Sequence, residues 1–223
     1  SCIARDYGTD AFEGYFVFDA DNLLNRDYVS RMNEAFDAGE RIVTSCRASK
    51  NFGDNWISSG YALWFLRESQ FLNHARFNLG TSCAVSGTGF LFSRAVLEET
   101  GPWPFHLLTE DIQFSVHEIL QGRKVAFAPD AVLYDEQPTT FRDSWNQRFR
   151  WAKGFYQVFA HYAGGLVKGT LTNPRGYRFA CYDMLMTIAP GMLLTIVSVL
   201  FNAIIIVLAA TGAMSTGVMI ASS

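Results

Sequence analysis

Two acidic residues follow a short apolar run near the start of the chain, where they could bind a metal ion. The run Tyr15–Phe18 predicts a buried strand, and Asp19 and Asp21 come directly after it. In an extended chain, side chains two residues apart point the same way, so these carboxylates would converge. Hard divalent cations bind such oxygens and keep positions open for phosphate. Taken alone, the D-x-D run is more typical of an acidic turn, in which Asn22 and the aspartates accept backbone hydrogen bonds.

Another acidic pair lies in Thr109-Glu110-Asp111, ahead of a predicted helix that runs to Leu120. A carboxylate at a fixed helix start can be aimed at a reacting group, so Asp111 could act as a general base, with Glu110 beside it. It would remove the proton from an acceptor hydroxyl. The alternative is structural, with Thr109 as the helix cap and both acids complementing the positive helix end.

A third group lies on a long predicted helix that begins at Phe141. Gln147, Arg150 and Trp151 are spaced i, i+3 and i+4, which places them on one face of that helix. An indole ring offers a stacking surface for a sugar, and a guanidinium binds a diphosphate through two donors. The alternative is an amphipathic interface helix with its Trp at the level of the lipid headgroups.

The elements that must position these residues alternate between strand and helix. This layout predicts an α/β fold. Strands are expected at 15–18, 41–46, 125–128 and 131–134, the last two around a Pro-Asp turn. Helices are expected at 28–38, 59–79, 93–100, 109–120 and 141–162.

The C-terminal part of the chain differs sharply from the rest. Residues 184–223 carry no charge, and Met184–Ala210 is longer than the ~20 apolar residues that span a bilayer. Residues 142–178 hold seven basic residues and one acid, against eleven basic and nineteen acidic residues in 1–141. The alternative for the apolar run is a buried core helix. We expect a transmembrane helix over 182–210, in the cell membrane, with the preceding catalytic part in the cytoplasm.

The same charges and the cysteines exclude other classes of protein. Basic and aromatic residues alternate over 142–178, but the acidic remainder argues against a nucleic-acid surface, and we expect no nucleic-acid partner. The four cysteines (Cys2, Cys46, Cys83 and Cys181) have no paired spacing. They indicate neither a disulfide framework nor a zinc site, and free thiols fit a reducing cytoplasm.

The motifs taken in order carry more information than any of them alone. D-x-D, T-E-D, Q-x-x-R-W and a membrane helix resemble the processive family-2 glycosyltransferases, a group that includes cellulose, hyaluronan and poly-N-acetylglucosamine synthases. The separation of thirty-six residues between Asp111 and Gln147 (147 − 111) is similar to that in the family. The resemblance covers nearly the whole chain.

The resemblance implies a role for each motif. Asp19 and Asp21 would bind Mg²⁺ or Mn²⁺ and the diphosphate of a UDP-sugar donor, and Asp111 would be the catalytic base. The helix with Gln147, Arg150 and Trp151 would line the junction of donor and growing chain. Ser86-Gly87-Thr88-Gly89 falls where the family places a small-residue loop near the acceptor, although an ordinary glycine turn fits it equally. The resemblance thus implies Gly87, Thr88 and Gly89 as acceptor-side or diphosphate-side residues.

In the family, a strand that precedes the D-x-D strand carries aspartates that bind the uridine. This chain has no counterpart of that strand. We therefore expect a fragment of a GT-A-like domain that lacks the N-terminal nucleotide-binding half. The expected divisions are the C-terminal part of the catalytic domain (1–140), a basic amphipathic interface helix and connector (141–181), the transmembrane helix (182–210), and the start of a further membrane segment or loop (211–223).

The expected function is inverting transfer of a sugar from a UDP-sugar to the hydroxyl of a growing polysaccharide, at the lipid bilayer. One alternative is transfer of a single sugar to a lipid-linked acceptor. Another is a catalytically inactive membrane scaffold. A transporter fits less well, because the sequence has one clear apolar span.

Overall fold

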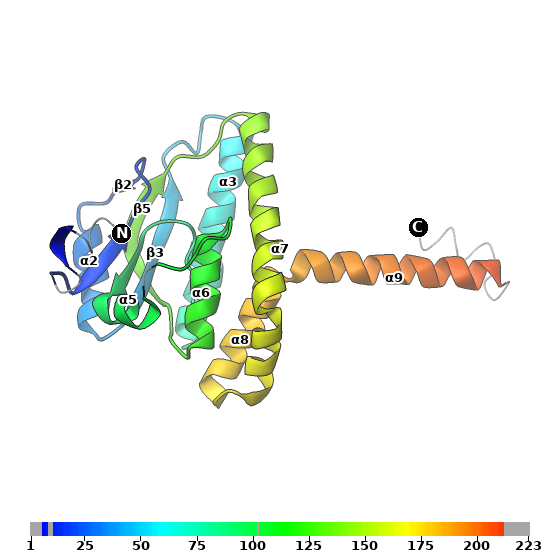
Figure 1. The fold of residues 1–223 in the computed structure, drawn as a ribbon. Helices are drawn as coiled ribbons and strands as arrows, with labels where there is room; N and C mark the ends of the chain where they lie inside the picture. The colour runs from blue at the N-terminus through cyan, green and yellow to red at the C-terminus, as the bar shows by residue number, and fades with distance from the viewer. Residues whose placement is uncertain (1–5, 9–10, 102, 212–223) are drawn as a thin grey trace. The chain divides into compact units, whose positions relative to one another are not determined.

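The computed structural model describes residues 6–8, 11–101 and 103–211, in a unit of residues 1–185 and a second unit of residues 186–223. Among the described residues of the first unit, the strands are β1 (Gly14–Val17), β2 (Leu23–Leu24), β3 (Ile42–Ser49), β4 (Phe90–Ser93) and β5 (Ala126–Asp135). Its helical segments are α2 (Tyr28–Asp37), α3 (Trp56–Leu66), the π-helical η1 (Arg67–Asn73), α4 (His74–Asn78), α5 (Arg94–Thr100), α6 (Glu110–Leu120) and α7 (Phe141–Thr172) (Figure 1). Two further helices, α8 (Arg175–Ile188) and α9 (Pro190–Ala210), follow.

The sheet order brings several strand ends to the same edge. The strands are arranged β1-β4-β3-β5-β2, with β3 and β5 parallel and the other neighbouring pairs antiparallel. Because β4 is antiparallel to both β1 and β3, the strands β1, β3 and β5 all run in one direction. Their carboxyl ends therefore lie at one edge, and this edge carries the acidic residues that follow β1. The mixed α/β fold predicted from the sequence is confirmed.

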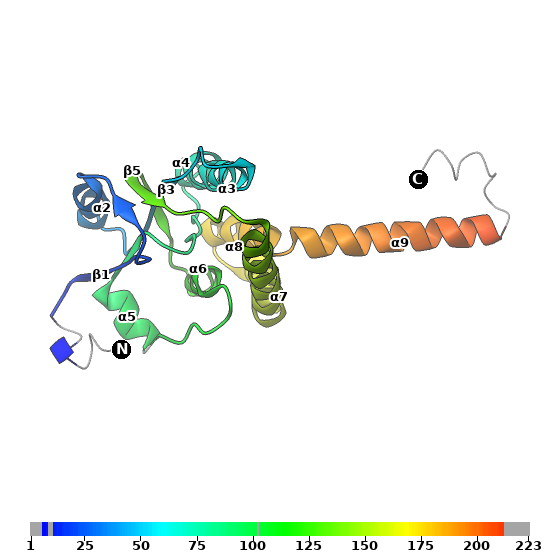
Figure 2. The same ribbon diagram turned by 90° about the horizontal axis from the view of Figure 1, so that it is seen from above.

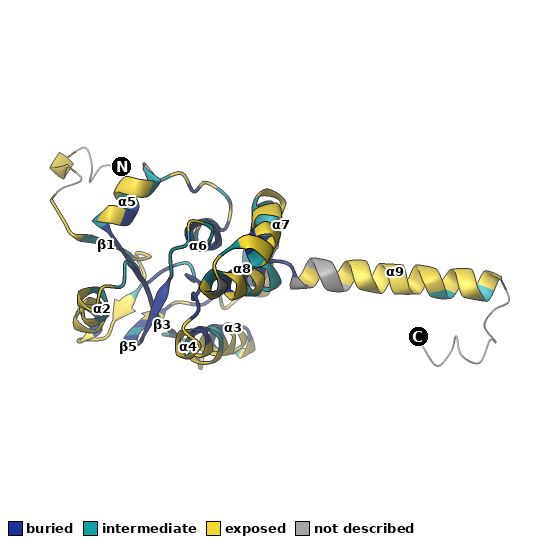
Figure 3. Cartoon of the chain, turned by 90° about the horizontal axis from the view of Figure 1, so that it is seen from below, coloured by how far each residue is buried: buried dark blue, intermediate teal, exposed yellow. Residues whose placement is uncertain are grey.

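Helices cover both faces of the sheet and bury its alternating side chains. On one face, Tyr28 and Met32 of α2 pack on Val43, Leu91 and Leu133. On the other face, the core includes one aromatic residue of α6 together with residues of β3, β4 and β5, namely Phe114, Ile42, Cys46, Phe90, Phe92 and Phe127. Figure 2 shows α2 and α6 on opposite sides of the sheet. In Figure 3 the central strands are buried, and the outward sides of the helices are exposed.

Two local predictions are wrong. The strands expected on either side of Pro129-Asp130 form one strand, β5, whose register against β3 shifts between Ser45 and Cys46. A bulge absorbs the extra residues there, because the parallel pairing with β3 resumes beyond it. The helix expected over 59–79 is divided into α3, η1 and α4, since residues 67–73 adopt the wider π-helical spacing.

The C-terminal helices also differ from the prediction. The expected helix over 182–210 is divided at Ala189, because α8 ends at Ile188 and α9 starts at Pro190. Proline supplies no backbone N–H and disfavours helical conformation in the residue before it, so a new helix begins there. In the described part of the chain, no helix has both the length and the apolar character needed to cross a membrane, so the transmembrane prediction is not supported. Of the segment predicted over 211–223, residues 212–223 lie outside the described residues.

Candidate active site

The first part of the site is a cluster of three carboxylates at the edge where β1, β3 and β5 end. Oxygens of Asp19, Asp21 and Asp135 lie within 4.8 Å of one another. Asp19 and Asp21 are exposed on the turn that follows β1, whereas Asp135 is buried at the end of β5. Partial desolvation and the neighbouring carboxylate of Asp135 raise the pKa of Asp19, and the cation Arg47 partly offsets this effect. Mutual repulsion of this kind is relieved when a cation binds.

A turn, rather than strand alternation, brings Asp19 and Asp21 together. β1 ends at Val17, and the N–H of Asn22 then donates to the carbonyl of Asp19 at 3.1 Å. The side chain of Asn22 accepts from the N–H of Asp19 at 3.1 Å and donates to Asp135 at 3.0 Å. The acidic turn that the sequence offered as the alternative is therefore present, and the carboxylates cluster within it.

The second part of the site is Asp111 at the start of α6. Asp111 is half-buried, and desolvation of its carboxylate raises its pKa to about 6. Hydrogen bonds from the N–H groups of Ile112 and Gly87 act in the opposite direction, while the charges of Glu110 and Glu68 raise the pKa further. A carboxylate with a pKa just below neutrality suits general-base catalysis, because it is ionised at neutral pH and still accepts a proton.

Glu110 is exposed and acts on both parts of the site. Its negative charge raises the pKa of Asp19 as well as that of Asp111. Thr109, by contrast, does not cap α6 with its side chain, and its buried hydroxyl has no hydrogen-bond partner among the described residues. The alternative in which Thr109 caps the helix with its side chain is therefore wrong.

The loop Ser86–Gly89 lies between the two parts of the site. Thr88 is buried, and its hydroxyl accepts from the N–H of Asp19 at 2.9 Å. Gly87 has a φ of +77° and donates its N–H to Asp111. Gly89 also has a positive φ, and a Cβ there would lie 1.8 Å from Leu133, so this position requires glycine. The loop thus touches both the carboxylate cluster and Asp111.

The long helix α7 packs beside both α3 and the start of α6. Trp151 contacts Tyr61 and Phe65 edge-on, with ring centroids 5.7 Å and 5.9 Å apart. The Oε1 of Gln147 is buried without a hydrogen-bond partner among the described residues, and the side chain of Arg150 is exposed. The structure therefore places the Q-x-x-R-W residues at the α3–α7 junction, and within the described part of the chain they make no hydrogen bond or ion pair with the carboxylates.

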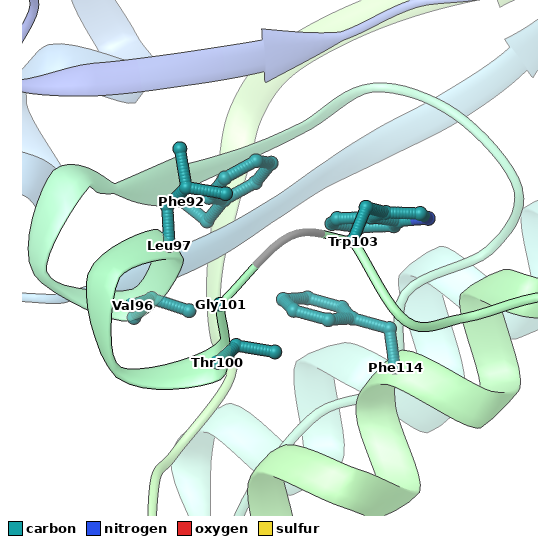
Figure 4. A pocket seen from close by; sticks show the side chains of 7 residues that line it. All are labelled: Phe92, Val96, Leu97, Thr100, Gly101, Trp103 and Phe114. Carbon is teal, nitrogen blue, oxygen red and sulfur yellow. The ribbon is translucent and has the colours of Figure 1, made fainter. Parts of the chain in front are cut away.

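A separate apolar pocket lies away from these residues, between α5 and α6 (Figure 4). Its lining comprises Phe92, Val96, Leu97, Thr100, Gly101, Trp103 and Phe114. The rings of Trp103 and Phe114 stack with centroids 5.3 Å apart, so this pocket is part of the aromatic core. It contains no charged group, and we assign no substrate to it.

Sequence reasoning missed three charged residues of the site, namely Arg47, Glu68 and Asp135. Asp135 follows the apolar run of β5 much as Asp19 follows that of β1, and the same strand-end argument could have found it. Arg47 is a single charge within the buried strand β3, a rare position that calls for a partner. Glu68 lies on the π-helical segment, and nothing in its sequence neighbourhood indicates its role.

Comparison with known proteins identifies the family. Residues 16–216 match the family described as Glycosyl transferase family group 2, and the chain belongs to this family. It is 25% identical over 182 residues to poly-beta-1,6-N-acetyl-D-glucosamine synthase of Staphylococcus aureus strain COL, covering 78% of this chain and 41% of the synthase. It is 33% identical over 70 residues to the probable glycosyltransferase YdaM of Bacillus subtilis strain 168, covering 31% of this chain and 17% of that protein.

Among solved structures, a mannosyltransferase from Pyrobaculum calidifontis, in complex with GDP-Man and Mn²⁺, is similar to this chain. The sequence identity is 19% and the TM-score 0.45, over 84% of this chain and 55% of the mannosyltransferase. The chain thus spans less than half the length of the two curated relatives named above.

Proposed function

We propose that this chain is part of a glycosyltransferase that moves a sugar from a UDP-sugar to the hydroxyl of a growing polysaccharide. The observation that carries the proposal is the placement of two kinds of carboxylate on either side of one loop. Asp19, Asp21 and Asp135 form an oxygen cluster, and Asp111 stands alone in a desolvated position. Membership of the glycosyl transferase family and the similarity to a polysaccharide synthase support this reading.

The residues of the cluster fit a divalent cation. The three carboxylates offer oxygen ligands only, which is the donor set that Mg²⁺ and Mn²⁺ prefer. Two of the three side chains are exposed, so positions for phosphate oxygens would stay open. When bound, the cation would neutralise the charge that develops on the leaving diphosphate.

Asp111 performs the proton transfer. Its carboxylate accepts the proton of the acceptor hydroxyl while the hydroxyl oxygen bonds to the anomeric carbon of the donor. The bond from that carbon to the diphosphate oxygen breaks, and its electron pair leaves with UDP. A single displacement of this kind inverts the anomeric carbon. Above a pH of about 6 the carboxylate is ionised and can accept the proton.

The residues of α7 would line the junction of donor and acceptor. Trp151 has an aromatic face at the α3–α7 junction, and the unpartnered Oε1 of Gln147 could accept a hydrogen bond from a sugar hydroxyl. Arg150 is exposed and free to meet the diphosphate. Gly87 and Gly89 would let the backbone of their loop approach the substrate closely.

We also propose that the protein works at the cell membrane, with its catalytic part on the cytoplasmic side. Residues 184–223 are uncharged, and α9 presents exposed apolar side chains such as Phe201 and Ile206. On α7, Phe141, Trp145 and Phe149 are exposed at a spacing of four residues, among basic residues. An aromatic and basic helix of this kind binds anionic headgroups.

A donor screen of the full-length protein in native membranes tests the proposal. UDP-sugars and GDP-sugars are supplied one at a time with Mg²⁺ or Mn²⁺, and nucleoside diphosphate release and product length are measured. A UDP-sugar should be consumed, and the product should be a polymer. A product with one added sugar on a lipid would show that the acceptor is lipid-linked and not a growing polysaccharide. Absence of turnover with every donor, in a folded protein, would leave the chain as a scaffold.

Alkaline extraction tests the location. The full-length protein should stay with the membranes after the wash, and deletion of residues 184–223 should release a large share of it. Recovery of the undeleted protein in the wash would contradict attachment through this segment.

A further inference from the structure

The mechanism above leaves unused a buried cation that lies between the two parts of the site. The Nε of Arg47 donates to Oδ2 of Asp135 at 3.0 Å, and its Nη2 donates to the same oxygen. Its Nη1 donates to the carbonyl of Ser86 at 2.9 Å. The guanidinium lies 3.7 Å from the centroid of the Phe65 ring, and the side chain is 10% exposed. All three nitrogens of one side chain are therefore committed, to two different segments.

On one side, Arg47 touches the loop that reaches the base. Ser86 makes two hydrogen bonds in this region. Its carbonyl accepts from Arg47, and its hydroxyl donates to Glu68 at 3.0 Å. The next residue, Gly87, donates its N–H to Asp111. A Cβ on Gly87 would lie 3.3 Å from Nη1 of Arg47 and 4.0 Å from Oδ2 of Asp111, so this residue is flanked by both groups. Arg47 and Asp111 thus contact consecutive residues of the same turn.

On the other side, Arg47 forms an ion pair with Asp135, one carboxylate of the metal cluster. Oδ2 of Asp135 accepts from two nitrogens of Arg47 and also from Gln137 at 3.0 Å. Oδ1 accepts from Asn22 at 3.0 Å. A cation that uses Asp135 as a ligand must share these oxygens with the guanidinium and meets its positive charge at short range. Arg47 therefore opposes binding of a cation at the cluster.

We infer that Arg47 is a positioning residue that joins the two parts of the site, holding the Gly87 turn against Asp111 while it withholds part of Asp135 from the metal. This inference rests on the proposed function. It has an unusual consequence, because loss of Arg47 should tighten metal binding and loosen the loop. If Arg47 merely stabilised the fold, its removal would loosen the loop and also weaken metal binding.

Arg47→Met and Arg47→Lys separate these two effects in the chain itself. Binding of Mn²⁺ alone is measured by electron paramagnetic resonance, and backbone amide exchange over residues 85–90 by mass spectrometry. For Arg47→Met we expect about tenfold tighter Mn²⁺ binding, since one unit charge beside the cluster is lost. We also expect faster exchange in the loop.

Arg47→Lys should keep Mn²⁺ affinity within about threefold of the unchanged chain, because the charge remains. The loop should still exchange faster, since an ammonium lacks the planar fork that reaches Asp135 and Ser86 together. Arg31→Met is the matched control. Arg31 is an exposed residue of α2 paired with Asp27 and Glu34, and its loss should change neither measurement.

The two readouts keep this inference separate from the proposed function. If the unchanged chain does not bind Mn²⁺, the metal assignment falls, and loop exchange in the Arg47 variants still decides the link to Asp111. If Arg47→Met does not fold, the loop exchange of Arg47→Lys decides the same question. Unchanged exchange over residues 85–90 in the folded variants, or weaker Mn²⁺ binding in Arg47→Met, overturns the inference.

Discussion

The two carboxylate sites of this molecule use the same functional group in different surroundings. Asp19 and Asp21 lie exposed on a turn, close to a third carboxylate, and this arrangement calls for a cation. Asp111 is half-buried at a helix start, and desolvation raises its pKa to about 6. Under the proposed function, the surroundings of each carboxylate, rather than its residue type, would divide metal binding from proton transfer.

The largest expected effect is on Asp111, the proposed base. Asp111→Asn keeps the shape of the side chain and removes the proton acceptor, so transfer should fall by at least about a hundredfold while donor affinity changes little. UDP release and donor binding are measured with the full-length enzyme in membranes. Glu110→Gln serves as the control and should reduce the rate of transfer less than Asp111→Asn does. A loss below threefold for Asp111→Asn, in folded protein, would leave this aspartate as a helix-start residue.

Substitution within the carboxylate cluster should affect metal binding first, in contrast to substitution of Asp111. Asp21→Ala removes one cation ligand, so the affinity for Mn²⁺ should fall by at least about tenfold, with donor binding falling alongside it. A titration followed by electron paramagnetic resonance measures the change. Asp37→Ala, at an exposed aspartate of α2, is the control and should leave Mn²⁺ binding unchanged. Full transfer activity in excess chelator would contradict the metal assignment altogether.

The pH dependence sharpens the same contrast. Because desolvation raises the pKa of Asp111 to about 6, the carboxylate is ionised above that pH and protonated below it. Transfer should therefore be about tenfold slower at pH 5 than at pH 8. Mn²⁺ binding must be measured at each pH, because the pKa of Asp19 is also raised. A rate that stays constant down to pH 4.5 with the metal bound would argue against Asp111 as the base.

The smallest expected effect concerns the packing of α7 on the start of α6. A Cβ on Gly154 would lie 2.5 Å from Cγ2 and 2.9 Å from the backbone nitrogen of Thr109. Gly154→Ala should lower the free energy of unfolding by about 1–3 kcal/mol, because the helix must move outward. Gly164→Ala meets no neighbour within 4 Å and should raise it by about 0.5–1 kcal/mol. Equal effects of the two changes in chemical denaturation would show that α7 does not pack tightly there.

The sequence predicted much of the fold and part of the site. Strand and helix patterns gave the α/β class, and the helix from Glu110 to Leu120 begins and ends close to the expected positions. Arg47, Glu68 and Asp135 were missed, and all three contact neighbours distant in sequence, although the strand-end argument could have found Asp135. Asp135 lies 116 positions after Asp19 (135 − 19), and only the parallel alignment of β1, β3 and β5 brings them together. The bulge in β5 was also invisible, since it arises from pairing with β3.

One paired titration tests most directly whether the two carboxylate sites have separate tasks. Mn²⁺ affinity is measured by electron paramagnetic resonance in Asp19→Asn, in Asp111→Asn and in the unchanged protein. Asp19→Asn should weaken binding by at least about tenfold, because a charged ligand is lost. Asp111→Asn should leave the affinity within about twofold. Equal weakening in the two variants would mean that Asp111 is a metal ligand, and the division between metal binding and proton transfer would be wrong.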